Sequence, residues 1–391
     1  ATCLQKPPNI EVVVDEGASQ ELTRVKTPWL VGTCLWPERF IRTAVLWLCR
    51  KVDKPILKLT YQDYIDNRLG QLLEATGQTY DMINIQVFND LQHTISGWPG
   101  GKPNADDSTR PERATPYPKR VLIFSPHPDD DVISMGGTFI RLIAQGHDVH
   151  VAYQTSGNIA VLDDIVLQTL DTARECGFVD RYNEVQEIIN NKKKGEAEPI
   201  ELRRLKGSIR RAEAKAACRQ MGLTDPSHVH FLNLPFYETG GVKKGLLTDK
   251  DIQIVVDLLR EIKPHQIYAA GDLSDPHGTH RVCIEAVLAA MEVVQDEEWV
   301  KECRLWLYRG AWQEWDLDMV DMAVPLSPDE VIQKRHAIYR HLSQKDIVPF
   351  PGEDKREFWQ RAEERNQNTA RLYDKLGMAE YQAIEVFVRL F

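Results

Sequence analysis

Along the C-terminal two-thirds of the chain, short apolar runs alternate with longer amphipathic stretches. The short runs, at 121–124, 149–153, 229–232, 266–270 and 304–308, predict buried strands. Apolar residues at helical spacing predict helices over 132–144, 209–221, 249–262 and 280–294, and a long helical region from 329 to about 376. Such alternation is typical of a mostly parallel sheet covered by helices. We therefore predict an α/β fold for this part of the chain.

The N-terminal part is expected to be a smaller α/β segment. A strand is predicted at 10–14 and a helix at 16–25, and helices at 40–51 and 61–75 then alternate with strands at 55–59 and 82–88. Residues 98–117 are rich in Gly and Pro, which predicts a linker. The expected organisation is a tail over 1–27, a connecting region over 28–97, this linker, and a main domain over 118–391.

Composition and charge narrow the classes of function. The formal net charge of −10 argues against a nucleic-acid partner, because phosphate contacts need an excess of Lys and Arg. No apolar run approaches the length of a membrane span, so no membrane association is expected. Seven dispersed cysteines without a C-x-x-C pair suit a reduced, cytoplasmic compartment. The chain begins without Met or a signal-peptide pattern, which suggests a fragment of a longer protein. The apolar run at 40–49 is expected to be exposed and to mediate homo-oligomerisation.

Polar side chains gather where the first strand of the main domain ends. His127, Asp129, Asp130 and Asp131 follow this strand directly and precede a predicted helix. In open α/β sheets, ligand sites lie at the carboxyl ends of strands. Three adjacent carboxylates beside an imidazole repel one another unless a cation is bound. The stretch therefore predicts a metal site.

A later strand end carries a second polar cluster, which contains His277 and His280. These two residues either face one ion together or divide roles around it. A catalytic zinc takes three protein ligands and leaves one position for water, and His127, Asp130 and His280 would fill that set. Asp129 would then be a general base, and a protonated His277 would hold a developing oxyanion. Fe²⁺ or another divalent metal suits similar ligands. Capping by the Asp pair and packing by the two histidines are the alternatives.

Two motifs resemble those of a known family. Pro-His-Pro-Asp-Asp at 126–130 and His-Gly-Thr-His at 277–280 look like the motifs of the PIG-L/LmbE family of zinc-dependent N-deacetylases. The resemblance covers about residues 118–391 and implies a Rossmann-like, mostly parallel sheet with helices on both faces. It implies the same ligands, the same general base and the same oxyanion role for His277 as above. That family acts mainly on N-acetylglucosaminyl compounds, so a small-molecule amino sugar is the expected substrate.

Substrate contacts are predicted at four residues. Arg210 matches a family arginine that touches substrate, and the adjacent Arg211 could substitute for it. Ser156 and Asn158 follow the second strand and are predicted to line the pocket, with a plain turn as the alternative. Six further histidines are predicted to be structural or receive no role (His147, His150, His228, His230, His336 and His341).

The N-terminus carries a second resemblance. Residues 4–23 look like the last strand and helix of glucosamine-6-phosphate deaminases, and the whole chain is similar to the C-terminal part of bacterial proteins that fuse such a deaminase to a PIG-L-type domain. The association makes N-acetylglucosamine 6-phosphate the leading candidate substrate. Hydrolysis of another N-acyl group, or binding of metal or sugar without turnover, remain alternatives.

Overall fold

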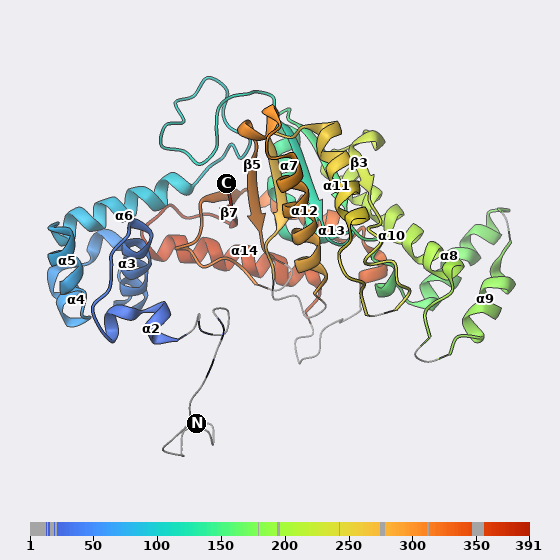
Figure 1. Cartoon of the computed structure of the whole chain (residues 1–391), viewed down its shortest axis with the longest axis horizontal. Coiled ribbons are helices and arrows are strands. Elements are labelled where there is room, and N and C mark those ends of the chain that lie inside the picture. Colours follow the sequence, from blue (N-terminus) through green and yellow to red (C-terminus); the bar gives the residue numbers. More distant parts are fainter. Residues whose placement is uncertain are drawn as a thin grey trace, which may run out of the picture. The chain divides into compact units, whose positions relative to one another are not determined.

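The structure is a computed structural model of the whole chain, and Figure 1 shows its helices and strands. It describes Val13, Asp15, Ser19 and residues 22–178, 180–193, 196–241, 243–273, 278–310, 313–345 and 356–391. The chain divides into two compact units: unit 1 comprises residues 1–92 and 375–378, and unit 2 comprises residues 93–374 and 379–391. Most of the strand predicted at 10–14 and most of the helix predicted at 16–25 lie outside the described residues.

Every regular element that the structure describes in unit 1 is a helix. Its elements are α2 (Thr23–Lys26), η2 (Pro28–Leu30), α3 (Glu38–Val52), η3 (Ile56–Lys58), α4 (Tyr61–Asp66), α5 (Gly70–Thr76) and α6 (Tyr80–Thr94). The strands predicted at 55–59 and 82–88 are wrong, because the first contains the short η3 and the second lies inside α6. Ile83, Val87 and Leu91 are buried at every fourth position, which is a helical spacing. A short alternating run does not distinguish this spacing from that of a strand.

The apolar surface expected at residues 40–49 is not exposed. These residues lie in α3, and six of their side chains are buried (Ile41, Ala44, Val45, Leu46, Leu48 and Cys49). The Trp29 ring packs edge-on against Phe40 and Trp47, with ring centroids 5.4 Å apart in both pairs. The apolar run at 40–49 is therefore not available as a surface for self-association, and homo-oligomerisation remains a prediction.

Unit 2 contains a seven-stranded sheet in the order β3-β2-β1-β4-β5-β7-β6. The strands are β1 (Arg120–Ser125), β2 (Asp148–Tyr153), β3 (Val229–Phe231), β4 (Gln266–Ala270), β5 (Arg304–Tyr308), β6 (Met322–Leu326) and β7 (Ala383–Arg389). Strands β1 to β5 pair in parallel, whereas β7 is antiparallel to both β5 and β6. The predicted α/β fold with a mostly parallel sheet is confirmed. Strands β6 and β7 were not predicted.

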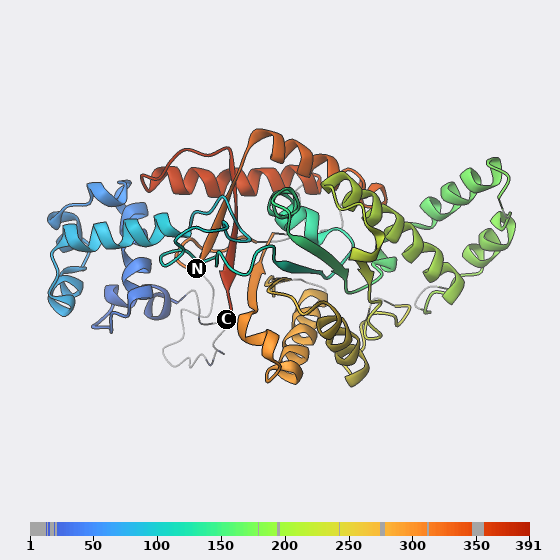
Figure 2. The same ribbon diagram turned by 90° about the horizontal axis from the view of Figure 1, so that it is seen from above.

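Helices cover both faces of this sheet. The helices that follow α6 are α7 (Asp130–Ala144), α8 (Asp163–Glu175), α9 (Tyr182–Asn190), α10 (Ile200–Met221), α11 (Asp249–Ile262), α12 (Thr279–Val294), α13 (Pro328–Ile338) and α14 (Phe358–Lys375), with the short 3₁₀ turns η4 (Asn158–Ala160), η5 (Pro226–His228), η6 (Glu298–Glu302) and η7 (Leu342–Gln344). Figure 2 shows α13 and α14 on one side of the sheet and α11 and α12 on the other. Val121 and Ile123 of β1 join the first core, and Leu122 and Phe124 join the second. Strand β1 is therefore buried on both faces, as alternating side chains require.

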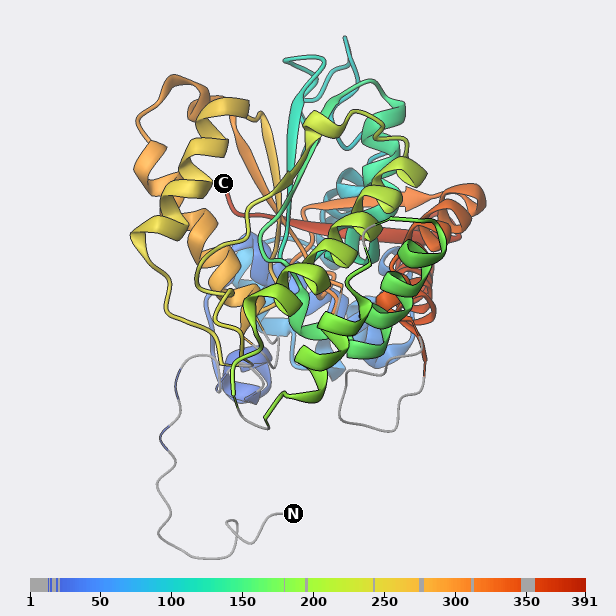
Figure 3. The same cartoon turned by 90° about the vertical axis from the view of Figure 1, so that its right-hand side faces the viewer.

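The structure changes two further predictions, those for the C-terminal helical region and for the linker. The long C-terminal helical region is two helices, α13 and α14, with η7 after α13, and residues 346–355 lie outside the described part. Helices α8 and α9 pack beside α10 around a small separate cluster (Figure 3). Residues 98–117, predicted to be a linker, belong to unit 2, where the Pro99 carbonyl accepts a hydrogen bond from Gln266 Nε2 at 2.9 Å. No helix among the described residues has the length and apolar character needed to cross a bilayer.

Parallel register decides where the functional side chains meet. Ser125, the last residue of β1, pairs with Tyr153, the last residue of β2. On the other side of β1, Ile123 pairs with Tyr268 of β4. The segments that follow β1, β2 and β4 therefore leave the sheet at the same edge, where ligand sites of such sheets are found.

Candidate active site

The connection between β1 and α7 carries the first half of the site. Asp131 N donates to Ser125 Oγ at 3.1 Å, and this hydroxyl donates to the His127 carbonyl at 2.5 Å, which closes a tight turn. Asp130 Oδ2 accepts a hydrogen bond from the backbone N–H of His127 at 2.9 Å. The same oxygen lies 3.2 Å from His127 Nδ1. The turn therefore brings one imidazole and one carboxylate together.

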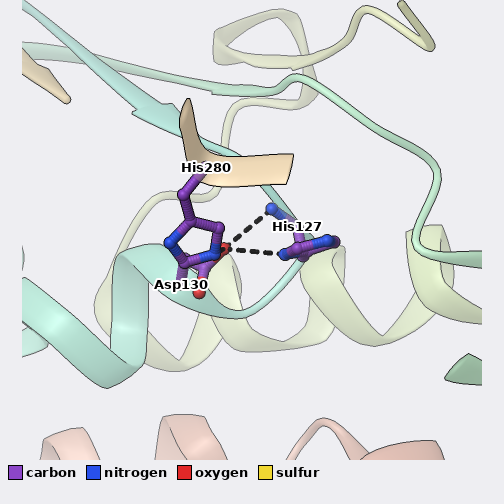
Figure 4. A group of neighbouring side chains, drawn as sticks. All are labelled: His127, Asp130 and His280. Carbon is purple, nitrogen blue, oxygen red and sulfur yellow. Dashed lines mark hydrogen bonds and ion pairs between the residues drawn. The ribbon is translucent and has the colours of Figure 1, made fainter. Parts of the chain in front are cut away.

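His280, in the first turn of α12, completes a group of three. Its Nε2 lies 3.2 Å from Asp130 Oδ2, and Figure 4 shows the Asp130 carboxylate close to both imidazole rings. One ligand atom from each of His127, Asp130 and His280 lies within 4.8 Å of the other two. In a tetrahedral zinc site with bonds of about 2.0–2.1 Å, neighbouring ligand atoms are about 3.3 Å apart. The donor types and the spacing therefore suit a divalent metal such as zinc.

The protonation state of Asp130 suits a metal ligand. Burial raises the pKa of its carboxyl, but the neighbouring His280 and His127 outweigh burial and hold that pKa below its usual range. The group is therefore an ionised carboxylate at neutral pH, which is the form that binds a cation.

Asp129, the predicted general base, is paired with a buried arginine. Arg210 Nη2 lies 3.0 Å from Asp129 Oδ2, and Arg210 is only 1% exposed. Burial lowers the pKa of Arg210, but the charges of Asp129 and Glu213 outweigh it, so the pKa is raised and the guanidinium stays charged. Gly157 makes room for this pair, since its φ is +64° and a Cβ there would lie 2.9 Å from Arg210 Nε. The ion pair fixes the orientation of the Asp129 carboxylate.

Asp131 supports the turn and is not a member of the group of three. Its Oδ2 accepts a hydrogen bond from Tyr153 OH at 2.9 Å, and its Oδ1 lies 3.2 Å from Ser125 Oγ. Burial raises the pKa of Asp131 to about 7; the hydrogen bond from Tyr153 opposes this rise, and the charge of Asp129 adds to it. The side chain thereby ties the turn to both β1 and β2.

A kink in α7 is held by side chains from the C-terminal part of the chain. Met135 has the non-helical angles φ −135° and ψ 26°. Two residues later, Glu385 of β7 accepts hydrogen bonds from the backbone N–H groups of Gly137 at 3.0 Å and Thr138 at 2.7 Å. Lys334 Nζ of α13 lies 2.6 Å from Glu385 Oε1, and both side chains are almost fully buried. A side chain that inserts into the helical hydrogen-bond ladder is a known cause of kinks. This network therefore fixes the helix that begins at Asp130.

Two of the predicted substrate residues lie in one buried hydrogen-bonded group. Ser156 is 5% exposed and Asn158 is 2% exposed. Asn158 Nδ2 donates to Ser156 Oγ at 2.7 Å and lies 3.0 Å from Glu238 Oε2. Their predicted contact with substrate remains a prediction.

Arg211 and His277 complete the set of predicted residues. Arg211 is half-buried, and its guanidinium carbon lies 6.0 Å from the centre of the Phe231 ring. Of the two adjacent arginines, Arg210 is the one that pairs with Asp129. His277 lies outside the described residues, and its oxyanion role remains a prediction.

His341 is a candidate residue of the active site that the sequence does not reveal. It is 2% exposed and lines a cavity of about 30 Å³ together with Asp129, Ile133 and Trp359. Neither of its ring nitrogens has a hydrogen-bond partner among the described residues. Burial lowers the pKa of His341 to about 4 against the opposing charge of Asp129, so the ring is neutral at pH 7. No spacing pattern marks this residue, because only the packing of distant segments brings it into the same cavity lining as Asp129.

Comparison with known families gives this arrangement a context. Residues 122–291 match the family model described as PIG-L, GlcNAc-PI de-N-acetylase. These residues form a PIG-L family domain. Within the PIG-L domain lie His127, Asp129, Asp130, Arg210 and His280, whereas the network of Lys334 and Glu385 lies beyond the matched range. The match supports an enzyme that acts as a deacetylase.

One relative extends over nearly all of the chain. A "Putative glucosamine-6-phosphate deaminase-like protein" of Bacteroides thetaiotaomicron is 53% identical over 400 residues. The alignment covers 99% of this chain and 60% of the relative, so the chain spans about three-fifths of that protein's length.

Solved structures with similar folds are more distant. The N,N'-diacetylchitobiose deacetylase of Pyrococcus horikoshii is 20% identical, with a TM-score of 0.44 over 70% of this chain and 84% of that one. The 4-carboxy-2-hydroxymuconate hydratase GalB of Pseudomonas putida is 17% identical, with a TM-score of 0.46 over 70% of this chain and 96% of that one. Similarities at this level carry no argument about the activity of the PIG-L domain.

Proposed function

We propose that the PIG-L domain hydrolyses the N-acetyl group of an N-acetylglucosamine-type sugar, with N-acetylglucosamine 6-phosphate as the leading candidate. The observation that carries the proposal is the group of His127, Asp130 and His280 next to the anchored carboxylate of Asp129. The description of the matched family as a de-N-acetylase supports the reaction. The name of the relative from Bacteroides thetaiotaomicron supports the sugar phosphate, because deacetylation of this substrate yields glucosamine 6-phosphate. That second argument rests on association rather than on the site.

Each side chain has a distinct role in this proposal. His127, Asp130 and His280 would hold a divalent cation, with zinc as the first candidate and Fe²⁺ as the second. When bound, such a cation acts as a Lewis acid toward water and the amide carbonyl. Asp129 takes the proton from the attacking water and passes it to the leaving nitrogen. His277 is proposed to stabilise negative charge on the carbonyl oxygen.

Arg210 has two possible uses, which kinetics can separate. Its ion pair with Asp129, at 3.0 Å, supports a role in orienting the base. That role predicts that Arg210→Lys lowers kcat by a similar factor for free and phosphorylated sugars. A role as phosphate anchor predicts instead that KM rises far more for the phosphorylated sugar. Arg219→Lys is the control, because Arg219 is an exposed arginine of the same helix, α10.

The central experiment measures acetate release and metal content together. Free, phosphorylated and oligomeric acetamido sugars are incubated with the full chain and with His127→Ala, Asp130→Ala and His280→Ala variants. We expect release by the wild type, with the phosphorylated monosaccharide preferred, and loss of both release and metal in the three variants. His336→Ala, which alters an exposed histidine of α13, should behave as wild type.

Different failures of this experiment have different meanings. If the three variants keep their full metal content, the ligand assignment is wrong. If the free sugar and its phosphate are hydrolysed with equal efficiency, the phosphate part of the proposal fails. If no acetamido sugar releases acetate while metal is bound, the substrate proposal fails, and hydrolysis of another N-acyl group or binding without turnover remains.

A further inference from the structure

A group of histidines lies at the end of the sheet opposite the candidate active site. His150 belongs to β2, His230 belongs to β3, and His228 ends η5, the turn that leads into β3. The ring of His150 stacks on that of His228 with centroids 4.2 Å apart, and on that of His230 with centroids 5.4 Å apart. From the sequence alone these residues are predicted to be structural. In the folded chain, however, their ring nitrogens lie close to one another and to a carboxylate.

A carboxylate faces two of these rings. Asp148 Oδ1 lies 3.4 Å from His150 Nε2 and 3.7 Å from His228 Nδ1. One ligand atom from each of Asp148, His150 and His228 lies within 4.8 Å of the other two. These distances are close to the separation of about 3.3 Å between neighbouring ligands in a tetrahedral zinc site. The donors are therefore spaced as three ligands of one ion.

One of the two imidazoles has a hydrogen-bond partner at its second ring nitrogen. His150 Nδ1 lies 3.1 Å from His230 Nε2. Histidine ligands of metals commonly use the second nitrogen in this way, and the partner orients the ring and fixes its tautomer. The other imidazole, His228, has Asp225 Oδ2 at 3.9 Å from its Nε2, which adds a second negative charge beside the group.

This group is separate from the one at the active site. Asp148 begins β2 and pairs with Arg120, whereas the turn with His127 follows Ser125, which pairs with the other end of β2. Five residues of strand correspond to about 16 Å, so one ion cannot serve both groups. The side chains of Asp148, His150 and His228 are 41%, 14% and 27% exposed, so an ion can reach them from solvent.

We propose that Asp148, His150 and His228 form a second binding site for a divalent transition metal, with His230 as an orienting partner. Two imidazoles and one carboxylate suit Zn²⁺, Ni²⁺ or Cu²⁺ and do not suit Mg²⁺ or Ca²⁺, which prefer oxygen ligands. The site links β2 to the segment that enters β3. Strand β3 has three residues and lies at the edge of the sheet, where it pairs with β2. A bound ion therefore stabilises this edge of the fold.

Zinc titration of the metal-free full chain tests the proposal. The wild type is expected to bind two equivalents of Zn²⁺. A His127→Ala/His280→Ala double variant, which lacks the first site, is expected to bind one. Adding His150→Ala or Asp148→Asn to that double variant should remove the remaining equivalent. Asp148→Asn is the milder change, because its side chain is partly exposed and keeps its shape.

Two further variants sharpen the test. In the double-variant background, His230→Ala should weaken zinc binding by roughly 10- to 100-fold without abolishing it, as expected for an orienting partner. His336→Ala, at an exposed histidine elsewhere, should change nothing. Zinc should also raise the melting temperature of the double variant, and this rise should disappear with His150→Ala.

The proposal is overturned if the double variant binds no zinc while its circular dichroism shows a folded chain. It is also overturned if Asp148→Asn and His150→Ala both retain the remaining equivalent with unchanged affinity. These outcomes do not depend on acetate release, so they stand apart from the proposed deacetylase activity.

Discussion

Replacement of Lys334 by Met tests whether the buried ion pair beside α7 holds that helix in place. The ammonium of Lys334 lies 2.6 Å from Glu385 Oε1 and 2.8 Å from Asn366 Oδ1. The side chains of Lys334 and Glu385 are 2% and 1% exposed. Met fills nearly the same volume but leaves the Glu385 carboxylate buried without a counter-charge. Removing one partner of a buried pair typically costs about 3–5 kcal/mol.

The structure also predicts how a second change modifies this cost. In Glu385→Gln the side chain keeps its size and one acceptor oxygen, so one of the N–H groups of Gly137 and Thr138 keeps its partner and the other loses it. In the Lys334→Met/Glu385→Gln double variant no unpaired charge remains, so the combined cost should be smaller than the sum of the two single costs. Contacting residues usually show coupling energies of about 0.5–3 kcal/mol.

Denaturant unfolding of the four proteins measures these terms. Circular dichroism and tryptophan fluorescence are followed together, because coincident transitions are needed for two-state analysis of a chain with two units. The control is Lys301→Met, which breaks an exposed pair with Glu298 and should change stability by less than about 0.5 kcal/mol. The reasoning is refuted if Lys334→Met costs no more than this control, or if the two single costs add in the double variant.

Three further predictions concern the site and its surroundings. Asp129→Asn should keep the bound metal but lower kcat for acetate release by about 10²- to 10⁴-fold, and near wild-type turnover would place the base elsewhere. Removal of metal by a chelator should abolish acetate release, and added zinc should restore it; activity that survives complete removal would contradict the proposed chemistry. His147 Nδ1 accepts a hydrogen bond from Lys119 N, and burial lowers the pKa of His147 from 6.5 to about 4. Protonation of the unfolded chain should therefore remove on the order of 2 kcal/mol of stability as the pH falls from 7 to 5, and His147→Gln should reduce this loss. Equal pH dependence of both proteins would contradict that assignment.

The sequence by itself determined the five parallel strands and the place of the candidate site. Strands such as β1 and β4 are buried on both faces, so they appear as continuous apolar runs that need no knowledge of the partner strands. Because parallel strands end at the same edge, residues that follow β1 and β4 were expected to meet, and His127, Asp130 and His280 do lie together. A local pattern is enough to locate such a strand, because nearly every residue of a central parallel strand is buried and therefore apolar.

Local patterns failed where the outcome depended on packing. Residues 82–88 alternate like a strand, yet they form part of α6 because burial of Ile83, Val87 and Leu91 on one helical face decides the structure. The edge strand β6 and its neighbour β7 were missed, although β7 supplies Glu385 to the kink of α7.

Tertiary structure alone decided which distant side chains became partners. Arg210 pairs with Asp129, and His341 lines a cavity together with Asp129, through the packing of segments that are far apart in the chain. Asp148, His150 and His228 meet because β2 and the segment entering β3 lie in parallel register. An ion pair or ligand set of this kind has no periodic pattern in the sequence, since its members are selected by three-dimensional distance and by the cost of leaving a buried charge unpaired.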